Sequence, residues 1–290
     1  MKKHITTILL IIILLAGLSL LLYPTVSDWW NSLHQSRAIA GYTEAVAGLD
    51  EESYEMWWEK ARQYNEELPH KKDRYRMTEE EKEEYEAQLN VAGNGIMGYI
   101  EIPRIKCSLP VYHGTDEAVL QIAVGHMVGT SLPVGGGTSH CVLSGHRGLP
   151  SAKLFTDLDK VEKGDYFLLH ILDETLAYEV DQITVVLPEE ANALELTAGK
   201  DYCTLVTCTP YGVNSHRLLV RGRRTDTLSE EDTQRITADA VQIETPLVAS
   251  VAAVPLIVVL TASLLYGGRR RRRKRAAGGR KQETQMQMVE

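Results

Sequence analysis

The stretch that decides the fold reads TLVTCTPYGVNSHRLLVRG, from Thr204 to Gly222. Apolar and β-branched residues fill its two ends, and Pro, Gly, Asn and Ser occupy its middle, which is the pattern of two strands joined by a turn. A turn from Thr209 to Ser215 would bring Arg217 back beside Cys208. Cys208 ends the first strand, where a substrate can reach the thiol while the strand fixes its position. A buried, unreactive thiol is the alternative interpretation of this cysteine.

A thiol nucleophile needs a base or an imidazolium beside it and a partner for the developing oxyanion. His146 ends an apolar strand and has glycines on both sides, so we expect it to be the general acid and base. His126 is the second choice, and it could instead be a turn or packing residue. We expect Arg217 to hold the oxyanion. The sequence predicts no metal and no cofactor.

The spacing of Gly and Pro residues from Gly98 onward predicts a β barrel over residues 91–224. Short apolar and β-branched runs follow one another here, with Gly and Pro between them, which is typical of a closed or nearly closed barrel. The clearest runs are 99–102, 108–112, 141–144, 166–171, 176–187, 202–207 and 218–221.

Two further cysteines give a prediction about how the strands pair. If the strands that end at His146 and Cys208 are parallel neighbours, Cys141 should face Cys203, because each lies five residues before its catalytic residue. Five is odd, so both thiols should point to the face opposite the catalytic pair. We favour two reduced thiols over a disulfide, since neighbouring parallel strands rarely offer the geometry of a bridge.

The sequence patterns of residues 31–90 predict a helical region ahead of the barrel. Apolar residues from Tyr54 to Leu68 recur at helical spacing, with glutamates between them. A second helix is expected over residues 78–89, because Thr78 and Glu81 form a capping-box pattern. A loop from Leu68 to Asp73 separates the two.

Two uncharged apolar runs predict membrane spans at 5–23 and 246–266. The first run, as a helix, is about 27 Å long, close to the thickness of the hydrocarbon layer. Trp29 and Trp30 would then lie in the aromatic belt of the interface. A cleaved signal peptide is the alternative for the first run, although the only good cleavage pattern, Ala38 to Ala40, lies far beyond it. A buried core helix is the alternative for the second.

The charge pattern gives the orientation of these spans. The chain has a net charge of −8, yet residues 1–4 and the tail 267–290 are basic. The acidic middle argues against nucleic acid as a partner. Basic residues on the cytoplasmic side of both spans leave residues 31–245 outside the cell, with 225–245 as a linker. The sequence thus predicts a two-pass membrane protein with an extracellular catalytic domain and two cytoplasmic termini.

Beyond these patterns, the stretch quoted above resembles the catalytic signature of the sortases, and within that family class C, which assembles pili. Further support comes from GYIEIP (98–103), LPVGG (132–136), LSGHRG (143–148) and LFTDL (154–158). The resemblance covers residues 90–224, and the layout with two anchors also matches class C.

The resemblance implies an eight-stranded barrel and a Cys–His–Arg site, here Cys208, His146 and Arg217, with Thr207 as a substrate contact. It implies that Cys208 attacks the Thr–Gly bond of an LPXTG-like sorting signal and forms a thioester. A lysine amine of the next pilin would then resolve the thioester. The implied partners are pilins and other surface proteins with such signals, and the implied class is that of the cysteine-peptidase hydrolases.

The sequence departs from class C in one motif. The family usually has a lid with an Asp-Pro-aromatic motif, and this chain has no Asp-Pro pair. Asp73 and Tyr75 are the nearest candidates, and counting back from the second helix would instead select residues 75–77.

Two other functions stay open at this point. One is a sortase that anchors surface proteins to an amine of peptidoglycan. The other is a binding protein on the same barrel, tethered to the membrane and without catalysis.

Overall fold

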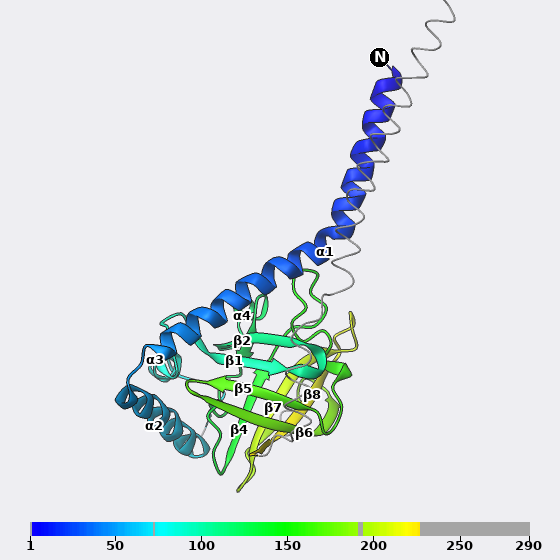
Figure 1. Cartoon of the computed structure of the whole chain (residues 1–290). Coiled ribbons are helices and arrows are strands. Elements are labelled where there is room, and N and C mark those ends of the chain that lie inside the picture. Colours follow the sequence, from blue (N-terminus) through cyan, green and yellow to red (C-terminus); the bar gives the residue numbers. More distant parts are fainter. Residues whose placement is uncertain (1, 72, 191–193, 227–290) are drawn as a thin grey trace, which may run out of the picture. The chain divides into compact units, whose positions relative to one another are not determined.

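The short apolar runs do form a closed barrel. The computed structural model describes residues 2–71, 73–190 and 194–226. Eight strands close the barrel in the order β1-β2-β3-β4-β7-β8-β6-β5. Figure 1 shows the barrel beside helix α1. The strands are β1 (Ile96–Ile102), β2 (Cys107–His113), β3 (Val124–His126), β4 (Ser139–Ser144), β5 (Tyr166–Ile171), β6 (Glu174–Val186), β7 (Asp201–Thr209) and β8 (His216–Thr225). The expected mostly-β fold is confirmed.

The parallel pair β4 and β7 lies at the centre of the site. Cys141 pairs directly with Cys203, as predicted from the spacing. Both thiols belong to the buried core, while Val142 and Val206 form a separate apolar cluster on the opposite face. The two cysteines therefore point away from the face that carries Cys208, and all four cysteines of the chain are free thiols.

The helices precede or interrupt the barrel. They are α1 (Lys2–Ala47), α2 (Glu51–Glu67), α3 (Glu79–Ala87) and the short α4 (Glu117–Leu120), with single 3₁₀ turns at η1 (Leu68–His70), η2 (Pro103–Ile105) and η3 (Leu158–Lys160). The predicted capping box is present, since the Thr78 side chain accepts from the Glu81 N–H and the Glu81 carboxylate accepts from the Thr78 N–H. The helical region packs on the barrel through hydrogen bonds such as the one from the Trp58 indole to Asp173, at 2.9 Å.

Helix α1 differs from the expectation of a separate span and a separate first helix. It is one helix, which continues through Pro24. Proline removes one hydrogen bond of the helix and bends it, and Figure 1 shows α1 changing direction between its apolar half and the half beside the barrel. The apolar half is long and apolar enough to cross a membrane, and its most apolar window buries nothing inside the protein.

The second half of α1 is part of the barrel's core. Tyr42 is buried, its hydroxyl donates to the Met97 carbonyl at 3.1 Å, and it accepts from the Leu172 N–H at 2.7 Å. Ala38 packs against the same core. A signal-peptide cleavage at Ala38 to Ala40 would cut through this docked segment, so the contacts favour the uncleaved anchor.

Strand β3 and the second apolar run stand apart from the other predicted elements. Strand β3 was not among the predicted strands, because a strand of three residues, one of them Gly125, has too few residues to show a period of two. The predicted second span, 246–266, and most of the predicted linker lie outside the residues that the structure describes.

Candidate active site

Cys208 and Arg217 are brought together by the hairpin of β7 and β8. The register pairs Cys208 directly with Arg217, and Thr209 with His216. Directly opposed residues of an antiparallel pair share a face, with Cβ atoms about 4.5–5.5 Å apart. The hairpin that the sequence predicts therefore places the Arg217 side chain on the same face of the sheet as the Cys208 thiol.

His146 reaches the same place from β4. Ser144 pairs with Val206, and beyond the end of β4 the Gly145 N–H still donates to the Val206 carbonyl at 3.0 Å. The Thr207 hydroxyl donates to the Gly145 carbonyl at 2.8 Å. These two bonds extend the parallel register by one residue, so His146 follows level with Cys208.

The glycines around His146 are closely packed rather than surrounded by open space. A Cβ on Gly145 would lie 2.7 Å from the Phe155 ring, and one on Gly148 would lie 2.7 Å from the Tyr211 ring. Phe155 also donates its N–H to the His146 carbonyl at 3.1 Å. The glycines thus let two aromatic rings hold the loop that carries the histidine.

Arg217 and His146 have different polar neighbours. The Arg217 guanidinium donates to the carbonyls of Asn214 and His216, at 3.2 and 3.1 Å. Both of these acceptors are neutral carbonyls and not carboxylates. A cation held by neutral carbonyls suits the task of receiving a developing oxyanion. His146 Nε2 lies 3.6 Å from a Glu117 carboxylate oxygen on α4. Sequence patterns do not mark Glu117, because the contact joins distant parts of the chain.

We expect Glu117 to be an accessory and not a member of the site. The carboxylate is largely exposed, and exposed ion pairs contribute about 0–1 kcal/mol. Glu117→Ala should therefore lower kcat/KM for a sorting-signal peptide by less than about fivefold. Gln121→Ala, which removes the other partner of Glu117, is the matched control. A loss of a hundredfold or more in Glu117→Ala would show that the carboxylate orients the imidazole during the reaction.

Thr207 and His126 have structural partners of their own. The Thr207 side chain is buried and lies on the face opposite Cys208, so its substrate contact stays a prediction. His126 is fully buried, donates from Nε2 to the Ser131 carbonyl at 2.8 Å and accepts at Nδ1 from the Tyr85 hydroxyl at 2.8 Å. With both ring nitrogens engaged in the core, His126 fits the packing role.

The other three thiols are poor nucleophiles for a substrate in solution. Burial raises the pKa of Cys107 to about 12 and raises the pKa of Cys203 well above its usual range. Burial also raises the pKa of Cys141, but hydrogen bonds with Cys203 and His126 together lower it below its usual range. Cys141 and Cys203 are only 2% and 0% exposed, so no substrate carbonyl reaches either sulfur. Cys208 is partly exposed.

The segment expected to form a lid is attached to the barrel through Arg74. The Arg74 side chain is 11% exposed, and its guanidinium donates to Glu195 at 2.8 Å and lies over the Tyr75 ring. The Arg74 carbonyl packs on Gly129, which has a φ of +81° and where a Cβ would collide with that oxygen. Asp73 contributes a backbone carbonyl to the turn, at 2.9 Å from the Arg76 N–H. Gating of the site by Asp73 and Tyr75 stays a prediction.

The Arg74 contact gives a sharper test of gating. Glu195 also accepts from His140 through its carbonyl at 3.0 Å, and His140 lies on β4, so the segment is tied to the outer face of the strand that leads to His146. If this segment covers the approach to Cys208, Arg74→Ala should speed alkylation of that thiol by about fivefold, the effect of about 1 kcal/mol. Arg76→Ala, the same change at an exposed neighbour, should leave the rate unchanged.

Gating by this segment would be contradicted if Cys208 were alkylated at the same rate in the unchanged chain and in each of the variants Arg74→Ala, Asp73→Ala and Tyr75→Ala. Alkylation is followed by mass spectrometry of the Cys208 peptide, so that the three other thiols do not contribute.

The described part of the chain offers no candidate metal centre. Among its residues there is no group of three or more His, Cys, Asp or Glu side chains that could hold a metal ion. The chemistry available to the described site is that of a thiol, an imidazole and a guanidinium.

Comparisons with known proteins find one domain family over the barrel. The family model of the sortase domain matches residues 100–225. Among curated proteins, sortase D of Bacillus subtilis is 32% identical over 130 residues, which is 44% of this chain and 63% of that protein. Sortase A of Streptococcus agalactiae is 32% identical over 117 residues, 39% of this chain and 47% of that protein. The matches span about half to two thirds of these curated relatives.

Solved structures match over a longer part of the chain. Sortase C1 of Streptococcus agalactiae is 49% identical, with a TM-score of 0.64, and the match covers 66% of this chain and 100% of that one. Sortase C of Streptococcus pneumoniae is 42% identical, with a TM-score of 0.58, over 67% and 98% of the two chains. Sortase C of Clostridium perfringens is 41% identical, with a TM-score of 0.55, over 66% and 99%.

Proposed function

Because the chain belongs to the sortase family, and within it to class C, we propose that it is a cysteine transpeptidase that joins pilin subunits. The observation that carries the proposal is the register of three strands. It pairs Cys208 with Arg217 across β7 and β8, and β4, which pairs with β7 up to Ser144 and Val206, ends two residues before His146. Sortase C of Streptococcus pneumoniae is described in terms of its pilin substrate specificity, which supports pilins as the substrate class.

The proposed reaction has two halves. The Cys208 thiolate attacks the threonine carbonyl of an LPXTG-like signal, and the charge that forms on the carbonyl oxygen is stabilised by the Arg217 guanidinium. The C–N bond to glycine breaks, His146 gives its proton to the departing amine, and a thioester remains on Cys208. In the second half, a lysine amine of the next pilin attacks the thioester, His146 takes the proton, and an isopeptide bond forms as the thiolate leaves.

The choice of acceptor decides the class of the enzyme. Transfer to water in place of the amine would make the same site a hydrolase of the cysteine-peptidase type. Transfer to an amine of peptidoglycan would make it a wall-anchoring sortase. The proposal is transfer to a pilin lysine, with the active site outside the cell, both termini in the cytoplasm and spans at both ends of the chain.

The test is to trap and then resolve the thioester. The full chain in membranes is incubated with an LPXTG-like peptide, and the mass of the Cys208 peptide should rise by that of the acyl group. Adding a candidate pilin should produce a covalent ladder, and adding a peptidoglycan amine should not. No adduct on Cys208 with any sorting-signal peptide would overturn the transpeptidase. An adduct resolved only by the wall amine would overturn the pilin assignment.

A further inference from the structure

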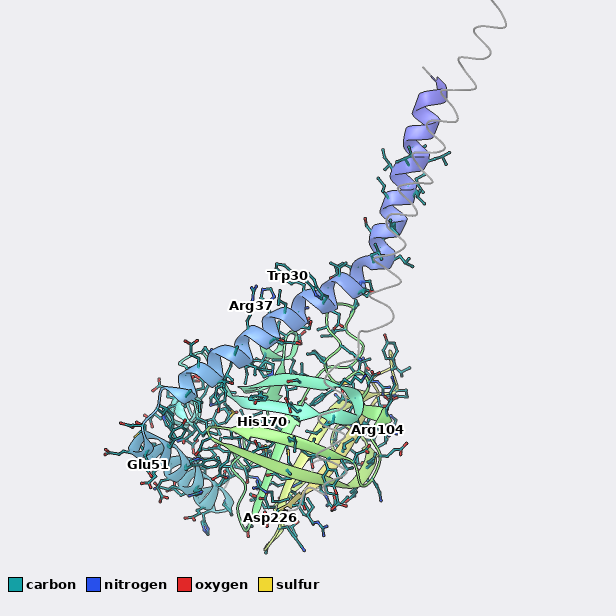
Figure 2. The ribbon with its side chains drawn as sticks, viewed as in Figure 1. Trp30, Arg37, Glu51, Arg104, His170 and Asp226 are labelled. Atoms are coloured by element: carbon teal, nitrogen blue, oxygen red, sulfur yellow. The ribbon has the colours of Figure 1, made fainter. Side chains whose placement is uncertain are left out.

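One face of α1 is bonded to the barrel from the membrane interface to the core. Its members recur at helical spacing, and we call this set the docking stripe: Asp28, Asn31, Gln35, Ala38, Tyr42 and Val46. Figure 2 shows Trp30 and Arg37 on the other side of α1, turned away from the strands. The membrane helix and the catalytic barrel are therefore joined along a single line of contacts and not through a flexible linker.

The first two residues of the docking stripe bind the loop that follows the catalytic histidine. An Asp28 carboxylate oxygen accepts from the Lys153 N–H at 2.7 Å, and the Asn31 amide donates to the Ser151 carbonyl at 2.7 Å. The same loop includes His146. It thus connects the residues just outside the apolar run directly to the active-site end of the barrel.

The height of this contact above the bilayer follows from the helix. Asp28 lies five residues beyond residue 23, where the predicted span ends, which is about 8 Å along the helix. Because α1 bends at Pro24, this length is the upper limit of the height of Asp28 above the hydrocarbon. The polar layer on each side of the hydrocarbon is about 5–8 Å thick. Trp29 and Trp30 are exposed beside Asp28, as expected of residues at an interface. The bonded loop therefore lies at the outer edge of the headgroups.

The same end of the barrel exposes apolar side chains. In the turn between β7 and β8, Tyr211 is 62% exposed and Val213 is 70% exposed. Tyr211 packs on Gly148 and lies 6.0 Å from the Arg147 guanidinium, so the turn rests on the loop that α1 holds. Val185 and Leu187, which are also exposed, lie at the end of β6 beside Arg217. Water is a poor solvent for exposed apolar side chains such as these, and the interfacial layer of a membrane is a good one.

We propose that the active-site rim, meaning the turn at residues 210–215 and the loop at residues 147–153, rests on the membrane surface. The partner of this surface is the lipid headgroup layer. Asp28 and Asn31 are positioning residues, which set the orientation of the barrel relative to the membrane. Strand β7 is about 26 Å long between its first and last residues. Lys200, just before the start of β7, then lies farther from the bilayer than the turn that follows the end of β7.

The experiment measures how close each end of the barrel lies to lipid. The full chain carries Cys208→Ala and Cys107→Ser, and a fluorophore is attached to Val213→Cys in one protein and to Lys200→Cys in the other. Both are placed in bilayer nanodiscs containing phosphatidylcholine with a spin label on its headgroup. We expect the fluorophore at 213 to be quenched at least threefold more than the one at 200. Equal quenching, or more at 200, would overturn the proposal.

The second arm tests the positioning residues. Asp28→Ala with Asn31→Ala should reduce the difference in quenching between 213 and 200 at least twofold, with the melting temperature in detergent kept within a few degrees. Asp28→Asn retains an oxygen that can accept the Lys153 N–H and should keep the full difference. Ser32→Ala, at an exposed serine that bonds within α1, is the matched control. An unchanged difference in the double variant would show that the docking stripe does not orient the rim.

The readout does not require catalysis. If the fluorophore at 213 is quenched but the chain with Cys208 forms no thioester, the proposed transpeptidase is overturned and the membrane-facing rim stands. If the thioester forms but 213 is quenched no more than 200, the membrane-facing rim is overturned and the transpeptidase stands.

Discussion

Cys208→Ala is expected to lose all of the proposed thioester formation and pilin joining while keeping the fold. The sulfur is the only atom at this position that can form the acyl-enzyme, and the side chain is partly exposed at the end of β7, outside the buried core. Removing a nucleophile that acts as a unit with its base leaves only the residual rate that binding supplies, a loss of about 10⁶-fold in a comparable serine enzyme. The measurement is the acyl-enzyme mass, with circular dichroism as the check on folding.

Cys107→Ala is the control for this variant. Cys107 is a free thiol in β2, which is separated from β7 in the barrel by β3 and β4. Its sulfur lies 3.9 Å from the Leu154 carbonyl oxygen. Activity should stay within about twofold of the unchanged chain. Full activity in Cys208→Ala would exclude the proposed mechanism and require another nucleophile.

Arg217→Ala is expected to lower kcat/KM by about 10²–10³-fold, the effect of removing one oxyanion donor in other acyl-transfer enzymes. Arg217→Lys should recover little of this, because an ammonium keeps the charge but not the planar fork that reaches two acceptors. The loss should fall mainly on kcat, since the oxyanion exists only in the transition state and the intermediate. His146→Ala should lose activity on a similar or larger scale, while His126→Ala should act through stability.

Arg223→Ala is the matched control for Arg217. Both arginines lie on β8 and on the same face, six residues apart, and Arg223 makes an exposed ion pair with Glu179 at 3.4 Å. Its replacement should change kcat/KM by less than about twofold. Equal losses in the two variants would mean that Arg217 acts through general charge and not through the oxyanion.

The parts of the site that follow from local sequence were predictable. The strand–turn–strand pattern around Cys208 fixes its distance from Arg217, because a hairpin brings its own ends together. Equal spacing before Cys208 and His146 predicted the pairing of Cys141 with Cys203. Thr78 and Glu81 predicted the start of α3, since a capping box acts within one turn of helix.

The parts that depend on long-range contacts were not predictable from one sequence. Glu117 reaches His146 only because α4 and the end of β4 meet in the folded barrel. Arg74 and Glu195 are 121 residues apart, and nothing near either residue marks it as a partner. Helix α1 passes through Pro24, although a proline inside a helical pattern normally suggests a boundary between two elements.

Tyr42 has a consequence for where the enzyme can be truncated. Its ring fills the core from α1, and its hydroxyl serves both the Met97 carbonyl and the Leu172 N–H. A fragment that starts after α1 would lose this aromatic side chain, at a cost of about 3–5 kcal/mol. It would also leave two buried backbone groups without partners, at about 1–3 kcal/mol each. Whole domains are stable by only about 5–15 kcal/mol, so the smallest soluble form that retains native stability begins within the anchoring helix itself.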